Sequence, residues 1–248
     1  MSSGEVPDSM GSVNGPGGAM TADDRAGNGA GTRSVYDALR RLILDGELPP
    51  GAEISQPELS RRLAVSRTPL REALRLLERE RLVVDTGPYR STRVSSLSPA
   101  DLDELYSLRV MGEGLAIWLT VPMLRAADIE RLEQDAALTA AGDPEAHRRF
   151  HAGLRIGAGP RLAEHLEQLS DHAERYQRSF VQYEPDREFV AAKLAEHREI
   201  VAACAAGDRQ RARELLVDHI AGTAMALMTA ERHAPFTLPS AVEMAKGR

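Results

Sequence analysis

Residues 56–84 read QPELSRRLAVSRTPLREALRLLERERLVV, and this stretch decides the fold of the N-terminal part of the chain. It predicts a short helix that opens at Gln56 and a second helix over residues 67–80, separated by a tight turn at Val65 and Ser66. The second helix carries apolar residues three or four positions apart, which is the spacing of one buried helix face. Those residues are Leu70, Ala73, Leu74 and Leu77. Two short helices joined in this way indicate a helix-turn-helix.

A β-hairpin and a preceding helix complete the predicted module. Residues 82–84 and 92–95 are expected to form two strands, because a turn with a Gly-Pro pair at residues 86–88 separates these apolar and β-branched runs. A helix over residues 32–45, ended by Gly46, comes before the helix-turn-helix. A helix-turn-helix followed by a small hairpin is a winged helix.

The exposed positions of the second helix carry side chains that suit DNA. Arg67 stands at the end of the helix that enters the major groove in this motif. An arginine there can make a two-pronged contact to guanine or phosphate. Ser66 is placed to cap the helix with its hydroxyl, and Thr68 can reach phosphate or a thymine methyl. The candidate DNA-binding residues of this helix are Ser66, Arg67, Thr68, Arg71 and Arg75. A basic face that meets only solvent is the alternative, but the complete motif favours DNA.

These residues resemble the DNA-binding domain of the GntR family of bacterial regulators. The resemblance rests on SRTPLREAL after ELSRRL, preceded by the pattern I-x-x-G-x-L-x-P-G. It implies further DNA contacts at a wing tip, near Gly87, Tyr89 and Arg90. The downstream residues are similar to the all-helical (FCD) ligand domain of the FadR-type subfamily. Together the two resemblances cover residues 32–233.

Composition agrees with a helical protein that has a DNA-reading module. Only 4% of the 248 residues are aromatic, so the core must rest on smaller aliphatic side chains, which suits helix packing. Residues 32–97 carry a net charge of +3, whereas residues 98–248 carry −6. A mildly basic module joined to an acidic body suits a DNA reader. A nucleoid-type DNA packager would need strong positive charge, but the whole chain has a net charge of −6.

Cysteine content and hydropathy predict a cytoplasmic protein. Cys204 is the single cysteine, so no disulfide can form within the chain. No apolar run approaches the ~20 residues of a membrane span. The N-terminal residues lack the basic region and apolar run of a signal peptide. We therefore expect no membrane association.

The rest of the chain predicts a helical bundle. Ser98 and Pro99 begin a helix that extends to residue 120. Further helices are expected over residues 126–140, 143–157, 160–182, 186–206 and 208–233. The predicted fold class is mainly α, with an N-terminal winged helix-turn-helix domain and a C-terminal antiparallel all-helical bundle. The expected divisions are a disordered tail (1–31), the winged domain (32–97), a helical effector-binding and dimerisation domain (98–234) and a loose tail (235–248).

Four histidines of the helical region are candidate metal ligands. His147 and His151 are four residues apart and share one helix face. Taken alone, this spacing favours ordinary surface or core histidines. The family resemblance implies that His197 and His219 join them around a divalent metal, with zinc expected and nickel or iron as alternatives. The sequence departs from the family at His147, where an Asp or Asn is usual. His165, His172 and His233 match no motif.

Arg109 and Glu113 are candidate effector-binding residues. They match the R-x-x-x-E pattern of the family, and an arginine that faces a cavity could hold a carboxylate ligand. An ion pair between neighbouring helical turns is the alternative.

The expected function is a DNA-binding transcriptional regulator, with repression as the expected mode, that responds to a small organic acid bound at a metal site. The expected partners are a palindromic double-stranded DNA operator, a carboxylate effector and a second copy of the chain. The alternative is a metal-dependent enzyme of small carboxylic acids with an accessory DNA-binding module. In HRRFH, however, Arg148 and Arg149 stand where a zinc protease needs its Glu. Cys204 lies in an apolar stretch and is expected to be a core residue rather than a nucleophile.

Overall fold

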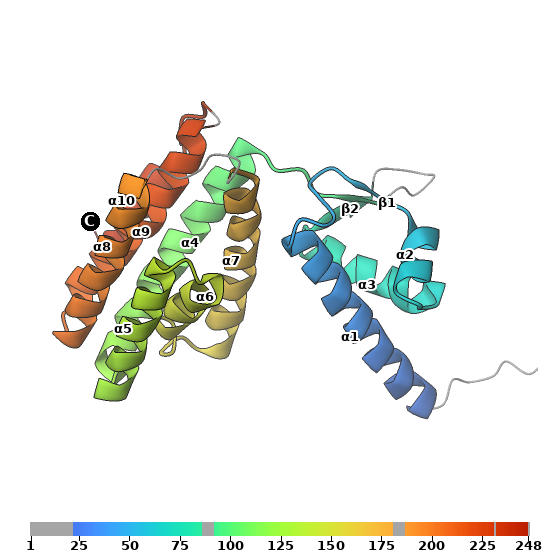
Figure 1. The fold of residues 1–248 in the computed structure, drawn as a ribbon, viewed down its shortest axis with the longest axis horizontal. Helices are drawn as coiled ribbons and strands as arrows, with labels where there is room; N and C mark the ends of the chain where they lie inside the picture. The colour runs from blue at the N-terminus through green and yellow to red at the C-terminus, as the bar shows by residue number, and fades with distance from the viewer. Residues whose placement is uncertain (1–21, 86–91, 181–186, 231, 248) are drawn as a thin grey trace, which may run out of the picture.

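The computed structural model describes residues 22–85, 92–180, 187–230 and 232–247. Figure 1 shows a small module with α1, α2, α3 and a sheet beside a larger, purely helical body. These residues form ten α-helices, one short 3-10 helix and one three-stranded sheet. The predicted fold class is therefore confirmed.

The N-terminal module is a winged helix-turn-helix. Its helices are α1 (Ala22–Leu44), α2 (Gln56–Arg62) and α3 (Arg67–Arg79), and its strands are β1 (Glu53–Ile54), β2 (Val83–Asp85) and β3 (Thr92–Val94). The strands are antiparallel in the order β1-β3-β2. Leu70, Ala73, Leu74 and Leu77 are all buried, as their spacing predicts. They pack with α1 and the sheet in a core of their own.

Capping and backbone geometry set the turns of this module. The Ser55 hydroxyl accepts a hydrogen bond from the Glu58 N–H at 3.4 Å and so caps α2. Gly46 ends α1 with φ at +79°, a conformation that costs glycine little. Ser66 is the N-cap residue of α3, but its side chain makes no capping hydrogen bond, so that prediction was wrong.

Two features of the module differ from the predictions. α1 begins at Ala22, so residues 22–31 are helical rather than part of a disordered tail. Extending a helix that has already formed costs less than starting one, which helps explain the longer α1. β1 was not predicted, because two residues are too short to display an alternating pattern, and its order depends on pairing with β3.

The helical body is built around α4 (Pro99–Thr120), which packs against α7, α9 and α10. The Ser98 side chain caps α4 by accepting from the Asp101 N–H at 3.1 Å. The next helices lie close to their predicted ranges: α5 (Ala126–Ala140), α6 (Pro144–Gly153), α7 (Pro160–Phe180), α8 (Arg187–Ala205) and α9 (Arg209–Ala230). A short 3-10 helix, η1 (Val121–Met123), follows α4. Of the helices in the described part of the chain, none is both long enough and apolar enough to cross a membrane.

The C-terminal segment is not the predicted loose tail. Residues Leu238–Lys246 form α10, which packs on α4 and α9 and buries Leu238, Ala241 and Ala245. The Asp103 carboxylate of α4 accepts hydrogen bonds from three consecutive backbone N–H groups just before and at the start of α10, at 2.7–3.2 Å. A helix of nine residues is only marginally stable on its own. Contacts with the bundle therefore supply the stability that the sequence of α10 does not provide.

α7 connects the helical body to the winged module. Asp171 of α7 forms an ion pair with Arg40 of α1, and Arg178 lies 3.4 Å from Asp45. Arg175 donates to the Ser95 carbonyl at 2.8 Å, in the segment that joins the two parts. α7 therefore contacts the winged module at three points along its length.

Replacing Asp103 by Ala should detach α10. Burial opposes ionisation of this carboxyl, but the three N–H donors hold the pKa of Asp103 below its usual value. The variant leaves those donors without their acceptor, so we expect a loss of about 2–3 kcal/mol in the free energy of unfolding. Urea unfolding measures the change. Glu104→Ala, at the exposed neighbouring position, is the matched control and should change stability little. Equal stability of the two variants would contradict the role of Asp103.

Candidate metal centre and nucleic-acid interface

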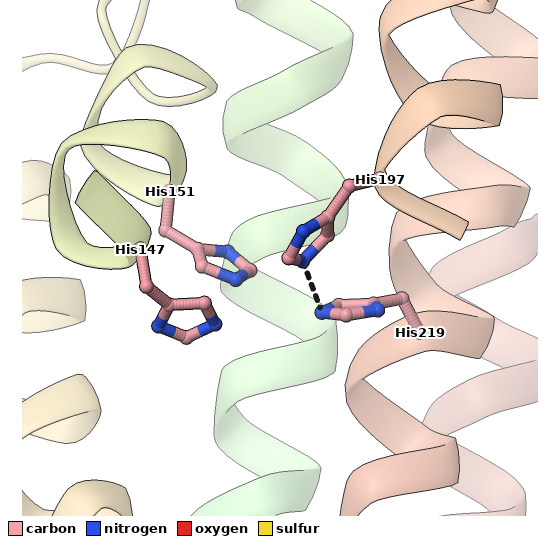
Figure 2. Close-up of side chains that lie close together, drawn as sticks. All are labelled: His147, His151, His197 and His219. Atoms are coloured by element: carbon pink, nitrogen blue, oxygen red, sulfur yellow. Dashed lines mark hydrogen bonds between the residues drawn. The ribbon is translucent and has the colours of Figure 1, made fainter. Parts of the chain in front are cut away.

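The structure brings four histidines together inside the helical body. His147 and His151 come from α6, His197 from α8 and His219 from α9 (Figure 2). One ring nitrogen from each lies within 4.8 Å of the others. His151, His197 and His219 are buried, and His147 is partly exposed. The four residues singled out in the sequence therefore meet, although they come from three helices.

The local sequence explains how α6 presents its two histidines. The Asp143 carboxylate caps α6 by accepting from the Glu145 and Ala146 N–H groups at 2.9 and 3.1 Å. Pro144 starts the helix without losing a needed donor. Residues four apart on this helix lie one above the other, and the rings of His147 and His151 are 4.6 Å apart between centroids.

His197 and His219 are arranged as two ligands of one ion would be. Their Nε2 atoms are 3.3 Å apart, and the dashed line of Figure 2 marks this contact. Two nitrogens at a Zn–N distance of ~2.0–2.1 Å in a tetrahedral site would be roughly 3.3–3.4 Å apart. His151 Nδ1 is buried and has no hydrogen-bond partner in the described part of the chain. His197 Nδ1 has none either, but it is not the nitrogen that faces His219. The separation of the two Nε2 atoms, with four imidazoles gathered at one place, fits a divalent transition metal.

Glu196 orients His219 from outside the cluster. Its Oε2 lies 2.7 Å from His219 Nδ1, so a proton on Nδ1 leaves the Nε2 lone pair directed at the cluster. Burial opposes ionisation of Glu196, but hydrogen bonds from His219 and Lys193 lower its pKa to about 2. The carboxylate therefore stays charged and keeps the ring in place. This residue was missed, although it directly precedes His197 in the sequence.

The imidazoles are held in their neutral form. Burial, with repulsion from the neighbouring His219, lowers the pKa of His147 to about 4 and that of His197 to about 3. Burial likewise places the pKa of His151 well below its usual value. Neutral imidazole is the form that binds a metal ion. The cluster therefore offers four neutral donors at neutral pH.

A cavity of about 630 Å³ opens beside the cluster, between α6 and α7. His147 and His151 line it together with Arg109, Arg148, Arg155 and Asp171. Arg148 binds Glu174 through two guanidinium nitrogens, at 2.6 and 2.9 Å, and so ties α6 to α7 at this cavity. This volume suits a small-molecule site.

Arg109 and Glu113 form an ion pair between neighbouring turns of α4, which was the alternative to a role in binding an effector. This ion pair is buried. Arg109 Nη2 lies 3.4 Å from Glu113 Oε1, and both residues are almost fully buried. Arg109 lines the cavity, whereas Glu113 is absent from the lining residues that the structure describes. Arg155, which was not predicted, lies 3.2 Å from the second oxygen of Glu113. Arg109 Nε is buried without a hydrogen-bond partner among the described residues.

The second helix of the winged module presents its basic residues to solvent. Ser66, Arg67, Thr68, Arg71 and Arg75 are all exposed, on the face opposite the buried leucines of α3. Arg75 forms an ion pair with Glu72 at 2.8 Å, which leaves Arg67 and Arg71 at the N-terminal half of the helix as the best placed for DNA. The predicted wing residues Gly87, Tyr89 and Arg90 lie outside the described residues.

Comparison with known proteins agrees with both parts of this architecture. Residues 32–93 match the bacterial regulatory proteins of the gntR family, and residues 104–222 match the FCD domain. An HTH-type transcriptional regulator of Agrobacterium vitis is 32% identical over 54% of this chain and 84% of its own length. The chain belongs to the GntR family. The HTH-type transcriptional repressor GlaR of Escherichia coli is 28% identical to this GntR protein, over 75% of this chain and 90% of GlaR.

A solved structure supports the same fold. E. coli McbR/YncC superimposes on this GntR protein with a TM-score of 0.69, at 22% identity, over 81% of this chain and 98% of that structure. The family and these relatives are transcriptional regulators, so this GntR protein is a transcriptional regulator and not an enzyme. The alternative of a metal-dependent enzyme is thereby overturned.

Removing two imidazoles should abolish metal binding. We expect the wild-type protein to bind one zinc ion per chain, and His151→Ala, His197→Ala to bind almost none, because two donors cannot hold the ion as four do. Glu196→Gln should weaken binding roughly 10–100-fold without abolishing it. Zinc content after dialysis is measured by elemental analysis. His165→Ala, at an exposed position outside the cluster, is the control. Stoichiometric zinc in the double variant would place the metal elsewhere.

Arg67 and Arg71 should carry much of the affinity for DNA. Arg67→Ala should weaken binding to the protein's DNA operator by ~1–3 kcal/mol if the guanidinium contacts a guanine pair. Each phosphate contact that is lost should also make the binding affinity less dependent on salt concentration. Fluorescence anisotropy with labelled operator measures both effects. Arg79→Ala, at the other end of α3, is the control. Unchanged affinity in an Arg67→Ala, Arg71→Ala variant would refute this interface.

Proposed function

We propose that this protein is a ligand-responsive repressor whose operator binding is controlled by a small carboxylic acid bound beside a metal ion in the helical body. The observation that carries the proposal is the four-histidine cluster at the wall of a cavity. Arg109, which is almost fully buried, lines the same cavity. A buried, partly unpaired arginine next to a metal-binding cluster is an arrangement for an anion.

Zinc is the proposed ion, with nickel and iron(II) as alternatives. His147, His151, His197 and His219 would hold it, because four imidazoles are a competent donor set for each of these metals. Since all four donors are neutral, the ion would keep its double positive charge at the edge of the cavity. When bound, it would supply an electrostatic attraction for an anionic group of the effector.

The effector is proposed to be a small organic acid. Its carboxylate would lie near Arg109, whose Nε has no partner among the described residues. Glu113 neutralises part of the charge of Arg109 and Arg155 and keeps both guanidinium groups in place. We therefore assign Arg109 to effector binding and Glu113 to the positioning of Arg109, in place of a direct effector contact.

α7 is the proposed connection between the effector and the DNA-binding module. Asp171 lines the cavity and also pairs with Arg40 of α1. Arg40 in turn lies 3.2 Å from Glu80, the C-cap residue of α3. One chain of charged contacts thus leads from the cavity wall to the end of the DNA-reading helix. Coupling requires that effector binding change this arrangement.

Repression and dimerisation complete the proposal. The relative GlaR is a repressor, and a repressor that leaves DNA when an acid accumulates is the simplest use of such a site. A single helix reads few base pairs, whereas two modules related by a two-fold axis read a palindrome. We therefore propose a homodimer on a palindromic operator.

Removing Arg40 should separate effector binding from the DNA response. The zinc-loaded protein is screened by thermal shift against citrate, malate, lactate and gluconate, and the acid that stabilises it is tested for release of the operator. We expect Arg40→Ala to keep the thermal shift and to lose most of the change in operator affinity. Arg33→Ala, which removes an exposed ion pair of the same helix, is the control. An unchanged response in Arg40→Ala would exclude this route, and no zinc-dependent stabilisation by any carboxylate would refute the effector site.

A further inference from the structure

One face of α4 is apolar and open to solvent. Leu108, Met111, Leu115 and Leu119 are 49%, 38%, 52% and 40% exposed. They are spaced three or four residues apart and so form one continuous row along the helix. The other sides of α4 are buried against α7, α9 and α10. The central helix of the body is therefore left uncovered along a single row, which we call the α4 row.

The borders of the α4 row come from its neighbours. On one side, Gly112 lies close to Leu162 and Leu166 of α7. On the other side, the Arg209 and Arg213 guanidinium groups of α9 cover the Trp118 ring at 4.0 and 4.8 Å. Met123, 59% exposed, lies in the short 3-10 helix just beyond the end of α4. An apolar centre with charged side chains such as Arg209 and Arg213 at its edge is the composition of a protein interface.

Isolated exposed apolar side chains are common and need no partner. Leu138 on α5 and Met244 on α10 are examples, since each is the exposed large apolar residue of its own helix. The α4 row differs, because four such side chains share one helix face. A contiguous row of this kind is the pattern by which two helices pack together.

We propose that the α4 row packs antiparallel against the α4 row of a second copy, about a two-fold axis between Met111 and Leu115. In this register Met111 of each copy lies opposite Leu115 of the other, and Leu108 lies opposite Leu119. A two-fold axis makes the contacts reciprocal, so the same four side chains serve both copies. The inference rests on the proposed homodimer and names the surface that forms it.

Charge favours a second copy in the antiparallel orientation. Asp101 and Glu104 are exposed at the N-terminal end of α4, whereas Arg125 is exposed just beyond its C-terminal end. Antiparallel pairing places the acidic end of each helix beside the basic end of its partner. It also places the positive end of each helix dipole beside the negative end of the other, which is favourable. Parallel pairing would bring the two acidic ends together. The row is thus complementary to itself in one orientation.

The first experiment measures mass in solution by light scattering. We expect the wild-type protein to be a dimer, and Leu115→Glu to be a monomer, because the substitution places two carboxylates beside each other near the axis. Leu138→Glu and Met244→Glu add the same charge at exposed apolar positions outside the row and should remain dimers. Circular dichroism checks that all three variants are folded. A dimeric Leu115→Glu, or a monomeric wild type, overturns the proposal.

The second experiment tests the register by disulfide crosslinking. Cys204 is buried, and burial raises the pKa of its thiol to about 11, so it should stay out of the reaction. At ~1.5 Å per residue, two copies of position 115 would be roughly 6 Å apart along the helices, and two copies of position 108 roughly 15 Å apart. A disulfide needs Cα atoms within ~7 Å, and the lateral gap between the helices adds to these offsets. Met111→Cys should therefore crosslink to Leu115→Cys, and Leu108→Cys to Leu119→Cys, because these pairs lie opposite each other, whereas Leu108→Cys should not crosslink to itself. Strong self-crosslinking of Leu108→Cys, or no crosslink between Met111→Cys and Leu115→Cys, overturns the antiparallel register.

These outcomes are independent of the metal and the effector. A dimer that persists in Leu115→Glu, while zinc and operator still bind, contradicts only the assigned surface. A protein crosslinked between Met111→Cys and Leu115→Cys that binds neither zinc nor operator contradicts the proposed function and leaves the surface intact.

Discussion

The helical body depends on polar side chains that are buried along a single helix. Asp103, Ser107, Arg109 and Glu113 of α4 are each at most 6% exposed. A buried charge without partners is strongly destabilising, so the three charged groups require partners at fixed places, whereas the Ser107 hydroxyl donates to the Asp103 carbonyl of its own helix. Asp103 fixes the start of α10, and Glu113 fixes Arg109 and Arg155 beside the cavity. The start of α10 and the positions of Arg109 and Arg155 are therefore tied to buried polar groups of α4.

The histidine cluster meets the same constraint in a different way. Its four imidazoles avoid the cost of a buried charge by remaining neutral, as the lowered pKa values of His147 and His197 indicate. Two buried ring nitrogens nevertheless lack a hydrogen-bond partner among the described residues. Unsatisfied nitrogens in a well-packed core reduce stability, so the neutral cluster carries a cost of its own. An ion held between the Nε2 atoms of His197 and His219 would leave the cost at His197 Nδ1 in place.

Local patterns in the sequence were sufficient for most of the helices. The grouping of the four histidines came instead from the resemblance to the family, because in the sequence only His147 and His151 share a helix face. The buried row of α3 and the Ser98 cap of α4 are each encoded within one or two turns of chain, and both were predicted correctly. Other features depend on contacts between distant segments. β1 exists through its pairing with β3, α10 through Asp103, and the position of Arg155 through Glu113. The spacing of apolar residues along the sequence does not predict contacts between such distant segments. Glu196 is an intermediate case, because its place beside His197 was visible but its partner was His219 on the next helix.

The arrangement of the two parts assigns separate tasks to two helices that pack together. α7 contacts the cavity through Asp171 and the winged module through Asp171, Arg175 and Arg178. α4 contributes Arg109 to the same cavity and leaves its apolar row open on another face. If two copies pair through α4, two sets of contacts determine the distance between the two DNA-reading helices. One is the contact between the two α4 helices, and the other is the contact of α7 with the winged module in each copy. Half-sites one helical turn apart require a spacing of about 34–36 Å. A small change in the contacts of α7 with the winged module would then act on both modules of the dimer at once. The proposed effector, bound between α6 and α7, would in this way alter operator affinity without any contact with the DNA.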